Sequence, residues 1–214
     1  MSVRDSSWGN LPVPPDPLSA DADERLCRWL RALVATPGLT AIRDLEEARR
    51  VLLDDSLRGA ELVRSFDGPL VDVGSGGGVP GIPLAYALPD REVTLLEANG
   101  RKCEFLRRWA PPNATVVQAR AEEHVTDEYG VAVAKALASP PVAAEWCLPL
   151  VRPGGAAILW VGASARPDRV ARVAERLGGG LGDSPPGFLV LRKLAPTPPG
   201  FPRRTGVARK RPLA

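Results

Sequence analysis

The sequence predicts an α/β protein: a doubly wound, mostly parallel sheet preceded by a helical cap. From about residue 69 onward, short β-branched runs alternate with amphipathic stretches, which is the pattern of parallel strands joined by helices. The first of these runs breaks into a cluster of glycines that opens a helix. A chain of 214 residues is long enough for one such domain with short appendages.

Before the sheet, the sequence predicts a proline-rich segment and the cap. Residues 1–18 contain several prolines and show no hydrophobic period, so we expect them to be disordered. Within 19–66, apolar residues recur at helical spacing in three stretches, and a capping pair of Asp21 and Glu24 opens the first. The three helices are expected from Asp21 to before Pro37, from about Arg43 through Leu52, and from Ser56 to Phe66.

Residues 67–194 form the expected domain of alternating strands and helices. Strands are expected at Leu70–Val73, Val93–Leu96, Thr115–Gln118, Val131–Ala134, Ala156–Val161 and Phe188–Leu194. Helices are expected at Pro80–Leu88, Arg101–Ala110, after Pro140 and at Pro167–Leu177, with a turn at Pro153–Gly155 and a glycine-rich loop before the last strand. Ligands of such sheets bind beyond the carboxyl ends of the strands, so residues that follow the strands are candidates for a site.

The glycine cluster after the first strand has the spacing of a cofactor loop. Asp72 is followed by Gly74, Gly76 and Gly78, a G-x-G-x-G pattern. Glycine can adopt positive φ and lets a ligand approach the backbone closely, and the helix that follows offers unpaired N–H groups. A dinucleotide loop would need glycine where Val79 stands. The pattern resembles that of S-adenosylmethionine (SAM) methyltransferases.

A carboxylate stands where a nucleotide-like ligand needs one. Glu97 ends the second expected strand, 23 residues after Gly74. An acidic residue at about 20 residues from such a loop binds the hydroxyls of a ribose. Together with the strand before the loop and the helix after it, Glu97 favours a nucleotide-like ligand over a structural turn.

Four stretches carry a resemblance to a known family. Residues 39–44 read L-T-A-I-R-D, residues 72–83 read D-V-G-S-G-G-G-V-P-G-I-P, residues 119–123 read A-R-A-E-E and residues 201–206 read F-P-R-R-T-G. They resemble motifs of the 16S rRNA guanine-N7 methyltransferases, called RsmG or glucose-inhibited division protein B (GidB). The resemblance implies a Rossmann-like class I SAM-dependent methyltransferase whose partner is 16S rRNA or the small ribosomal subunit. It also implies direct in-line methylation of a guanine in the 530 loop, without a general base.

The same resemblance implies roles for single residues at the carboxyl ends of the strands. Those expected to bind the cofactor are Gly74, Ser75, Gly76, Val79, Glu97, Ala121, Glu122 and Lys135. Within this set, Glu97 would hold the ribose, and Ala121 and Glu122 would border the adenine. Lys135 would be a positioning residue near the SAM carboxylate or an RNA phosphate. No residue is assigned to the chemical step, because guanine N7 has an in-plane lone pair and carries no proton.

The sequence departs from the family pattern at Lys135 and in the N-terminal match. Lys135 stands where the family carries an arginine, and a lysine lacks the planar fork of a guanidinium. In the family's R-H-L-L-D-S-L segment, Val51 replaces the histidine, and residues 52–57 contain one residue more.

The positive charge of the chain is concentrated at its C-terminus. The chain has 28 basic and 25 acidic residues, and residues 195–214 hold five basic residues and no acidic one. A basic tail of this kind can be a solvated segment or can neutralise phosphates of a nucleic acid. The expected RNA-binding residues are Arg203, Arg204, Arg209, Lys210 and Arg211.

Other classes of protein are disfavoured by composition. The chain has no apolar run of about 18 residues and no apolar segment typical of a secretory signal, so we expect a cytoplasmic protein without a membrane span. Three scattered cysteines indicate reduced thiols, and the single histidine, His124, is expected to be solvated and to bind no metal. Nothing in the sequence indicates an oligomer, so we expect a monomer.

Two other functions fit the same fold. One is a SAM-dependent small-molecule methyltransferase, which deletion of residues 195–214 would leave active. The other is a non-catalytic ribosome-binding protein, which would bind SAM weakly or not at all.

Overall fold

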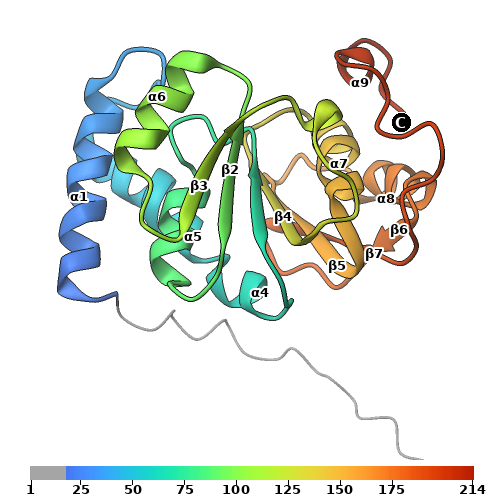
Figure 1. Ribbon diagram of the computed structural model, residues 1–214, viewed down its shortest axis with the longest axis horizontal. Coiled ribbons are helices and arrows are strands. Elements are labelled where there is room, and N and C mark those ends of the chain that lie inside the picture. The colour runs from blue at the N-terminus through green and yellow to red at the C-terminus, as the bar shows by residue number, and fades with distance from the viewer. Residues whose placement is uncertain (1–17) are drawn as a thin grey trace, which may run out of the picture.

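Seven strands form one sheet in the order β3-β2-β1-β4-β5-β7-β6 in the computed structural model, which describes residues 18–214 (Figure 1). The strands are β1 (Leu70–Val73), β2 (Val93–Glu97), β3 (Ala114–Gln118), β4 (Tyr129–Lys135), β5 (Val151–Trp160), β6 (Gly179–Leu181) and β7 (Phe188–Lys193). Strands β1 to β5 pair in parallel, whereas β7 is antiparallel to both β5 and β6. The chain builds β1, β2 and β3 outward on one side and then returns to add β4 on the other side of β1. The switch in strand order therefore lies between β1 and β4, which confirms the predicted doubly wound fold.

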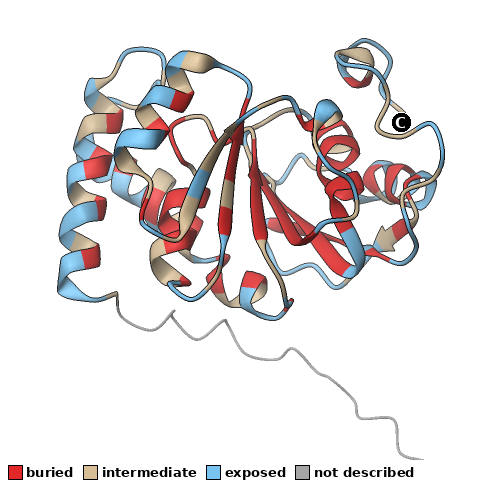
Figure 2. Ribbon diagram, viewed as in Figure 1, coloured by how far each residue is buried: buried red, intermediate tan, exposed pale blue. Residues whose placement is uncertain are grey.

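Helices cover both faces of this sheet. They are α1 (Ala20–Ala35), α2 (Leu45–Ala48), the π-helix η1 (Arg49–Asp54), α3 (Asp55–Leu57), α4 (Ala60–Arg64), α5 (Gly81–Ala87), α6 (Gly100–Trp109), the 3-10 helix η2 (Ala121–Glu123), α7 (Pro140–Cys147), the 3-10 helix η3 (Leu148–Leu150), α8 (Pro167–Arg176) and α9 (Val207–Lys210). Helix α1, for example, turns its buried residues toward the rest of the molecule and its exposed ones outward (Figure 2).

Alternation along the strands divides the core into two clusters. In β4, Val131 and Val133 pack with residues of the cap, α5 and α6, whereas Ala132 and Ala134 pack with residues of α7 and α8. Successive strand side chains point to opposite faces, so this division follows from the pleat. Asp72, Glu97 and Lys135 fall on the alternate positions that face the cap.

Most predicted elements are confirmed, and the differences have local causes. Helix α1 is capped by Ser19, whose Oγ accepts the Ala22 N–H at 3.2 Å, whereas Asp21 lies in the first turn and pairs with Arg25. Strand β5 begins at Val151, because the expected turn at Pro153–Gly155 is a bulge inside the strand rather than its start. The glycine-rich loop before the last strand contains β6, which pairs with β7.

The second cap helix is longer than predicted and contains one wide turn. It continues without a break from α2 through η1 to α3, and the expected third helix starts only at Ala60. The Asp55 N–H bonds to the carbonyl of Arg50, five residues back, instead of to Val51 as in an α-helix. This wide turn overlaps the stretch 52–57, in which the resemblance to the family predicted one additional residue.

The cap shares its core with the sheet. Trp29 of α1 is buried, and its indole N–H donates to the carbonyl of Gly77 at 2.9 Å. Helix α1 thereby touches the loop that follows β1. Residues 1–17, most of the segment expected to be disordered, lie outside the described residues, and the division into cap, central domain and tail stays a prediction. Within the described part of the chain, no helix is both long and apolar enough to cross a membrane.

We predict that Gly77→Ala destabilises the protein by about 1–3 kcal/mol, because a Cβ at Gly77 would lie 2.1 Å from Leu33 Cδ1 and would overpack the contact between α1 and the loop. The free energy of unfolding in urea measures this loss. Gly162→Ala is the matched control, since a Cβ there meets nothing within 4 Å. Equal stability of the two variants would contradict the packing described here.

Candidate functional site

The glycine loop lies at the carboxyl end of β1, beside the switch in strand order. Gly74, Gly76 and Gly78 adopt φ values of +71°, +57° and +97°, which side chains with a Cβ rarely allow. The loop is held to the neighbouring strand, since the Gly74 N–H donates to the Leu96 carbonyl at 2.8 Å. The predicted requirement for glycine at these positions is confirmed.

Ser75 points into the protein rather than out of the loop. Its hydroxyl donates to the carbonyl of Asp72 at 2.9 Å, and its exposed fraction is 1%. Any contact of Ser75 with a ligand above the loop would therefore be through its backbone.

Glu97 holds the loop in place. Its Oε2 accepts the N–H of Gly76 at 2.9 Å, and its Oε1 accepts the N–H of Asn99 at 2.8 Å. The side chain is mostly buried, at 8% exposed. The structure thus brings together the glycine loop and the carboxylate that the sequence placed on separate strands. Each oxygen retains a lone pair for a hydroxyl donor.

Asp72 is a functional candidate to which sequence reasoning assigned no role. It is fully buried, its Oδ2 accepts the Gly81 N–H at 3.0 Å, and its Oδ1 has no hydrogen-bond partner among residues 18–214. Burial raises the pKa of this carboxyl to about 7. The signal in the sequence was a carboxylate inside an otherwise apolar strand.

The backbone around Gly76 fits a nucleoside such as that of SAM. A Cβ on Gly74, Gly77 or Gly78 would collide with a packed side chain, whereas a Cβ on Gly76 would meet no atom closer than 3.8 Å. Gly76 therefore borders open space, and Glu97 lies beneath it. A ligand can approach the backbone there without a side chain in the way.

The turn after β3 holds the C-terminal tail. Ala121 is buried in the cluster that includes Val73 and Leu96. Glu122 Oε1 accepts the Gly206 N–H at 3.1 Å, so this carboxylate, expected to border adenine, contacts the tail.

Lys135 joins the end of β4 to the cap. Its ammonium pairs with the carboxylate of Asp55 and donates to the Val51 carbonyl at 2.6 Å. This is the carbonyl whose α-helical partner, the Asp55 N–H, is redirected by the π-turn. The next residue, Ala136, has a φ of +53°, and Leu137 then lies against Gly74.

The five basic residues of the tail fall into two groups. Arg203 forms a two-pronged ion pair with the buried Glu145, at 2.5 Å for each contact, and Arg209 lies over the ring of Trp146. The other three basic residues of the tail, Arg204, Lys210 and Arg211, have exposed side chains that make no ion pair or hydrogen bond with residues 18–214.

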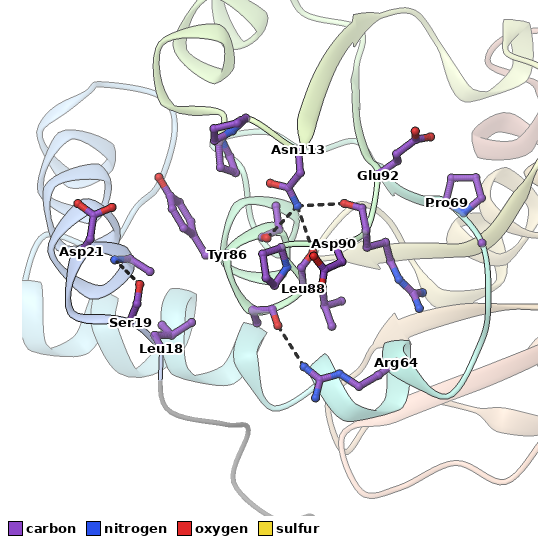
Figure 3. A pocket seen from close by; sticks show the side chains of 18 residues that line it. Leu18, Ser19, Asp21, Arg64, Pro69, Tyr86, Leu88, Asp90, Glu92 and Asn113 are labelled. Atoms are coloured by element: carbon purple, nitrogen blue, oxygen red, sulfur yellow. Dashed lines mark hydrogen bonds between the residues drawn. The ribbon is translucent and has the colours of Figure 1, made fainter.

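A large cavity of about 1100 Å³ lies at the opposite end of the sheet (Figure 3). It is bordered by residues that precede the parallel strands, such as Pro69 and Asn113. The Asn113 amide donates to three carbonyls around the end of α5, at 3.0–3.1 Å, which closes that turn of the chain. The cavity therefore does not include the glycine loop.

His124 is not solvated as predicted. Its Nε2 lies 2.7 Å from the hydroxyl of Tyr129, and burial lowers its pKa. Within residues 18–214, no group of three His, Cys, Asp or Glu side chains could hold a metal ion.

Comparisons with known proteins point to one family. Residues 23–175 match the family model described as GidB, rRNA small subunit methyltransferase G. Proteins named ribosomal RNA small subunit methyltransferase G are 38% identical in Roseiflexus sp. (strain RS-1), over 86% of this chain and 87% of that one, and 37% identical in Synechococcus sp. (strain JA-2-3B'a(2-13)), over 83% and 79%. A third, from Synechococcus elongatus, is 34% identical over 93% of this chain and 92% of that one.

We predict that Asp72→Asn gains stability relative to the natural protein as the pH rises. The folded-state pKa lies above that of the unfolded chain, so the contribution of Asp72 to stability is complete below about pH 4 and is lost as the pH rises through 7. An asparagine has no such loss and keeps an acceptor for the Gly81 N–H. Urea unfolding at pH 5 and pH 8 should show a relative gain of up to about 3 kcal/mol. A difference independent of pH would contradict the raised pKa.

Proposed function

Since this chain belongs to the GidB family of small-subunit rRNA methyltransferases, we propose that it methylates N7 of a guanine in the 530 loop of 16S rRNA. As a member of the family, it is a SAM-dependent rRNA methyltransferase with a Rossmann-like fold. The atom, the nucleotide and the mechanism are the proposed part. The observation that supports a mechanism without a general base is that Glu97 and Lys135 are held by hydrogen bonds or an ion pair, while Asp72 is buried out of reach of a ligand.

That observation favours a reaction that needs no base. Both oxygens of Glu97 accept backbone amides, the ammonium of Lys135 is paired with Asp55, and the carboxyl of Asp72 is fully buried. Guanine N7 carries an unprotonated, in-plane lone pair, so no group has to remove a proton from it. SAM, when bound, supplies the activated methyl group. The residues of the site then act by orientation and by exclusion of water.

We propose the following cofactor contacts. SAM would contact the backbone of Gly74, Ser75 and Gly76 on the open side of the loop. Val79 would add an apolar side-chain contact. Glu97 would hold the ribose hydroxyls while it keeps its bond to Gly76. Residues further along the edge toward β3, Ala121 and Glu122, would border the adenine.

We propose that Lys135 acts as a positioning residue on the acceptor side. Through Asp55 and the Val51 carbonyl it fixes the cap to the end of β4. The turn that follows places Leu137 on Gly74. Since the ribose and adenine would lie toward β2 and β3, the methyl group and the guanine would lie on this β4 side.

The RNA-binding residues are proposed to be fewer than the sequence indicated. Arg204, Lys210 and Arg211 are exposed and available for phosphates, whereas Arg203 and Arg209 hold the tail on α7. The monomeric state, cytoplasmic location and independence of metal ions stay predictions.

The proposed atom can be tested chemically. Small ribosomal subunits that lack the modification, incubated with the protein and SAM, should become cleavable by borohydride and aniline at one guanine of the 530 loop, because N7-methylguanine is labile to that treatment. Primer extension locates the break. Methylation at another atom, or of small molecules only, would contradict the proposal. Glu97→Ala is the matched variant and should lower the yield through weaker SAM binding.

The division of the tail predicts two different phenotypes. Arg204→Ala, Lys210→Ala and Arg211→Ala should each weaken RNA binding and reduce the slope of log affinity against log salt by about 1. Arg203→Ala should instead destabilise the fold by about 2 kcal/mol or more, because Glu145 would be left buried without its partner. Salt-dependent RNA titrations and urea unfolding separate the two effects. A uniform effect of all four substitutions would refute the division.

A further inference from the structure

The C-terminal tail is hydrogen-bonded to η2, the turn that we propose borders the adenine. Two hydrogen bonds join them: the Gly206 N–H donates to Glu122 Oε1 at 3.1 Å, and the Thr205 hydroxyl donates to Glu123 Oε1 at 2.6 Å. Both acceptors belong to η2, the helical turn that follows β3 at the carboxyl edge of the sheet.

The tail is seated at this place by contacts on both sides of those bonds. Before them, Arg203 is paired with Glu145, and after them Ala208 is buried and Arg209 lies over Trp146. The backbone between is fixed in one shape, since Gly206 opens α9 with a φ of +79°. Its amide is thereby aimed at Glu122.

The same segment carries the basic side chains that are exposed to solvent and can bind RNA phosphates. Arg204 precedes Thr205 directly, Lys210 ends α9 and Arg211 follows it; all three are exposed. A phosphate bound by Arg204 would therefore lie one residue from Thr205, and one bound by Lys210 would lie one helical turn after Gly206.

We propose that η2 couples the two binding sites, so that occupation of the cofactor site strengthens RNA binding and RNA strengthens SAM binding. This inference rests on the proposed positions of adenine and RNA. Its physical basis is shared geometry: the two carboxylates of η2 position both the turn proposed to border the adenine and the segment that carries the basic side chains, so a ligand that stabilises one contact stabilises the other. The coupling must be reciprocal, because the affinities are thermodynamically linked.

Undocking the tail without removing its charges tests the coupling. Gly206→Pro removes the donated N–H and excludes positive φ, and Thr205→Val removes the hydroxyl. In calorimetric titrations of the full chain with SAM alone, Gly206→Pro should weaken affinity about fivefold or more and Thr205→Val about threefold. Thr205→Ser keeps the hydroxyl and should behave as the natural protein.

The effect of the cofactor site on RNA binding is measured with a fluorescent 16S rRNA transcript. S-adenosylhomocysteine should raise the affinity of the natural protein for this RNA and should not do so for Gly206→Pro, although every basic residue of the tail remains. Thermal unfolding checks that the variants stay folded. Equal SAM affinity of the natural protein and Gly206→Pro would overturn the coupling. If the coupling is found but N7 is not methylated, only the proposed function fails.

Discussion

The bond between the Gly76 amide and the Glu97 carboxylate is the contact on which the arrangement of the site depends. It ties the loop after β1 to the end of β2, so that the backbone open to a ligand and the acceptor for a ribose are set at one distance. The neighbouring glycines do not border open space, because packed side chains occupy the positions where their Cβ atoms would lie. One side of the loop is thus packed as a protein interior, and the other is free.

The N-terminal helices extend this constraint to the rest of the molecule. Trp29 and Leu33 of α1 support the loop from one side, and Asp55 of the cap binds Lys135 at the end of β4. Trp160, at the end of β5, donates its indole N–H to the Asp55 carbonyl at 2.9 Å. The cap is therefore attached at the carboxyl ends of three neighbouring strands, the edge at which ligands of such sheets bind.

Features set by local sequence could be predicted, and features set by distant partners could not. The glycine loop, Glu97 and most strands follow from spacing and alternation, which act over a few residues. Three features could not be predicted: Ser19 as the cap of α1, the π-turn and β6. At each of them the local sequence allows more than one conformation, and packing against the rest of the protein selects one. The roles of Arg203 and Glu122 were hidden because their partners, Glu145 and Gly206, lie 58 and 84 positions away. A charge run in the sequence cannot reveal which of its members are already neutralised.

The pairing of Glu145 with Arg203 has a consequence for biosynthesis. Glu145 is buried on α7, and its counter-ion lies 58 positions further along the chain. During synthesis, the carboxylate is therefore made well before the guanidinium that neutralises it. A chain cut before Arg203 would leave this carboxylate buried without its partner, so we expect it to unfold, and to be digested, more easily than the intact protein.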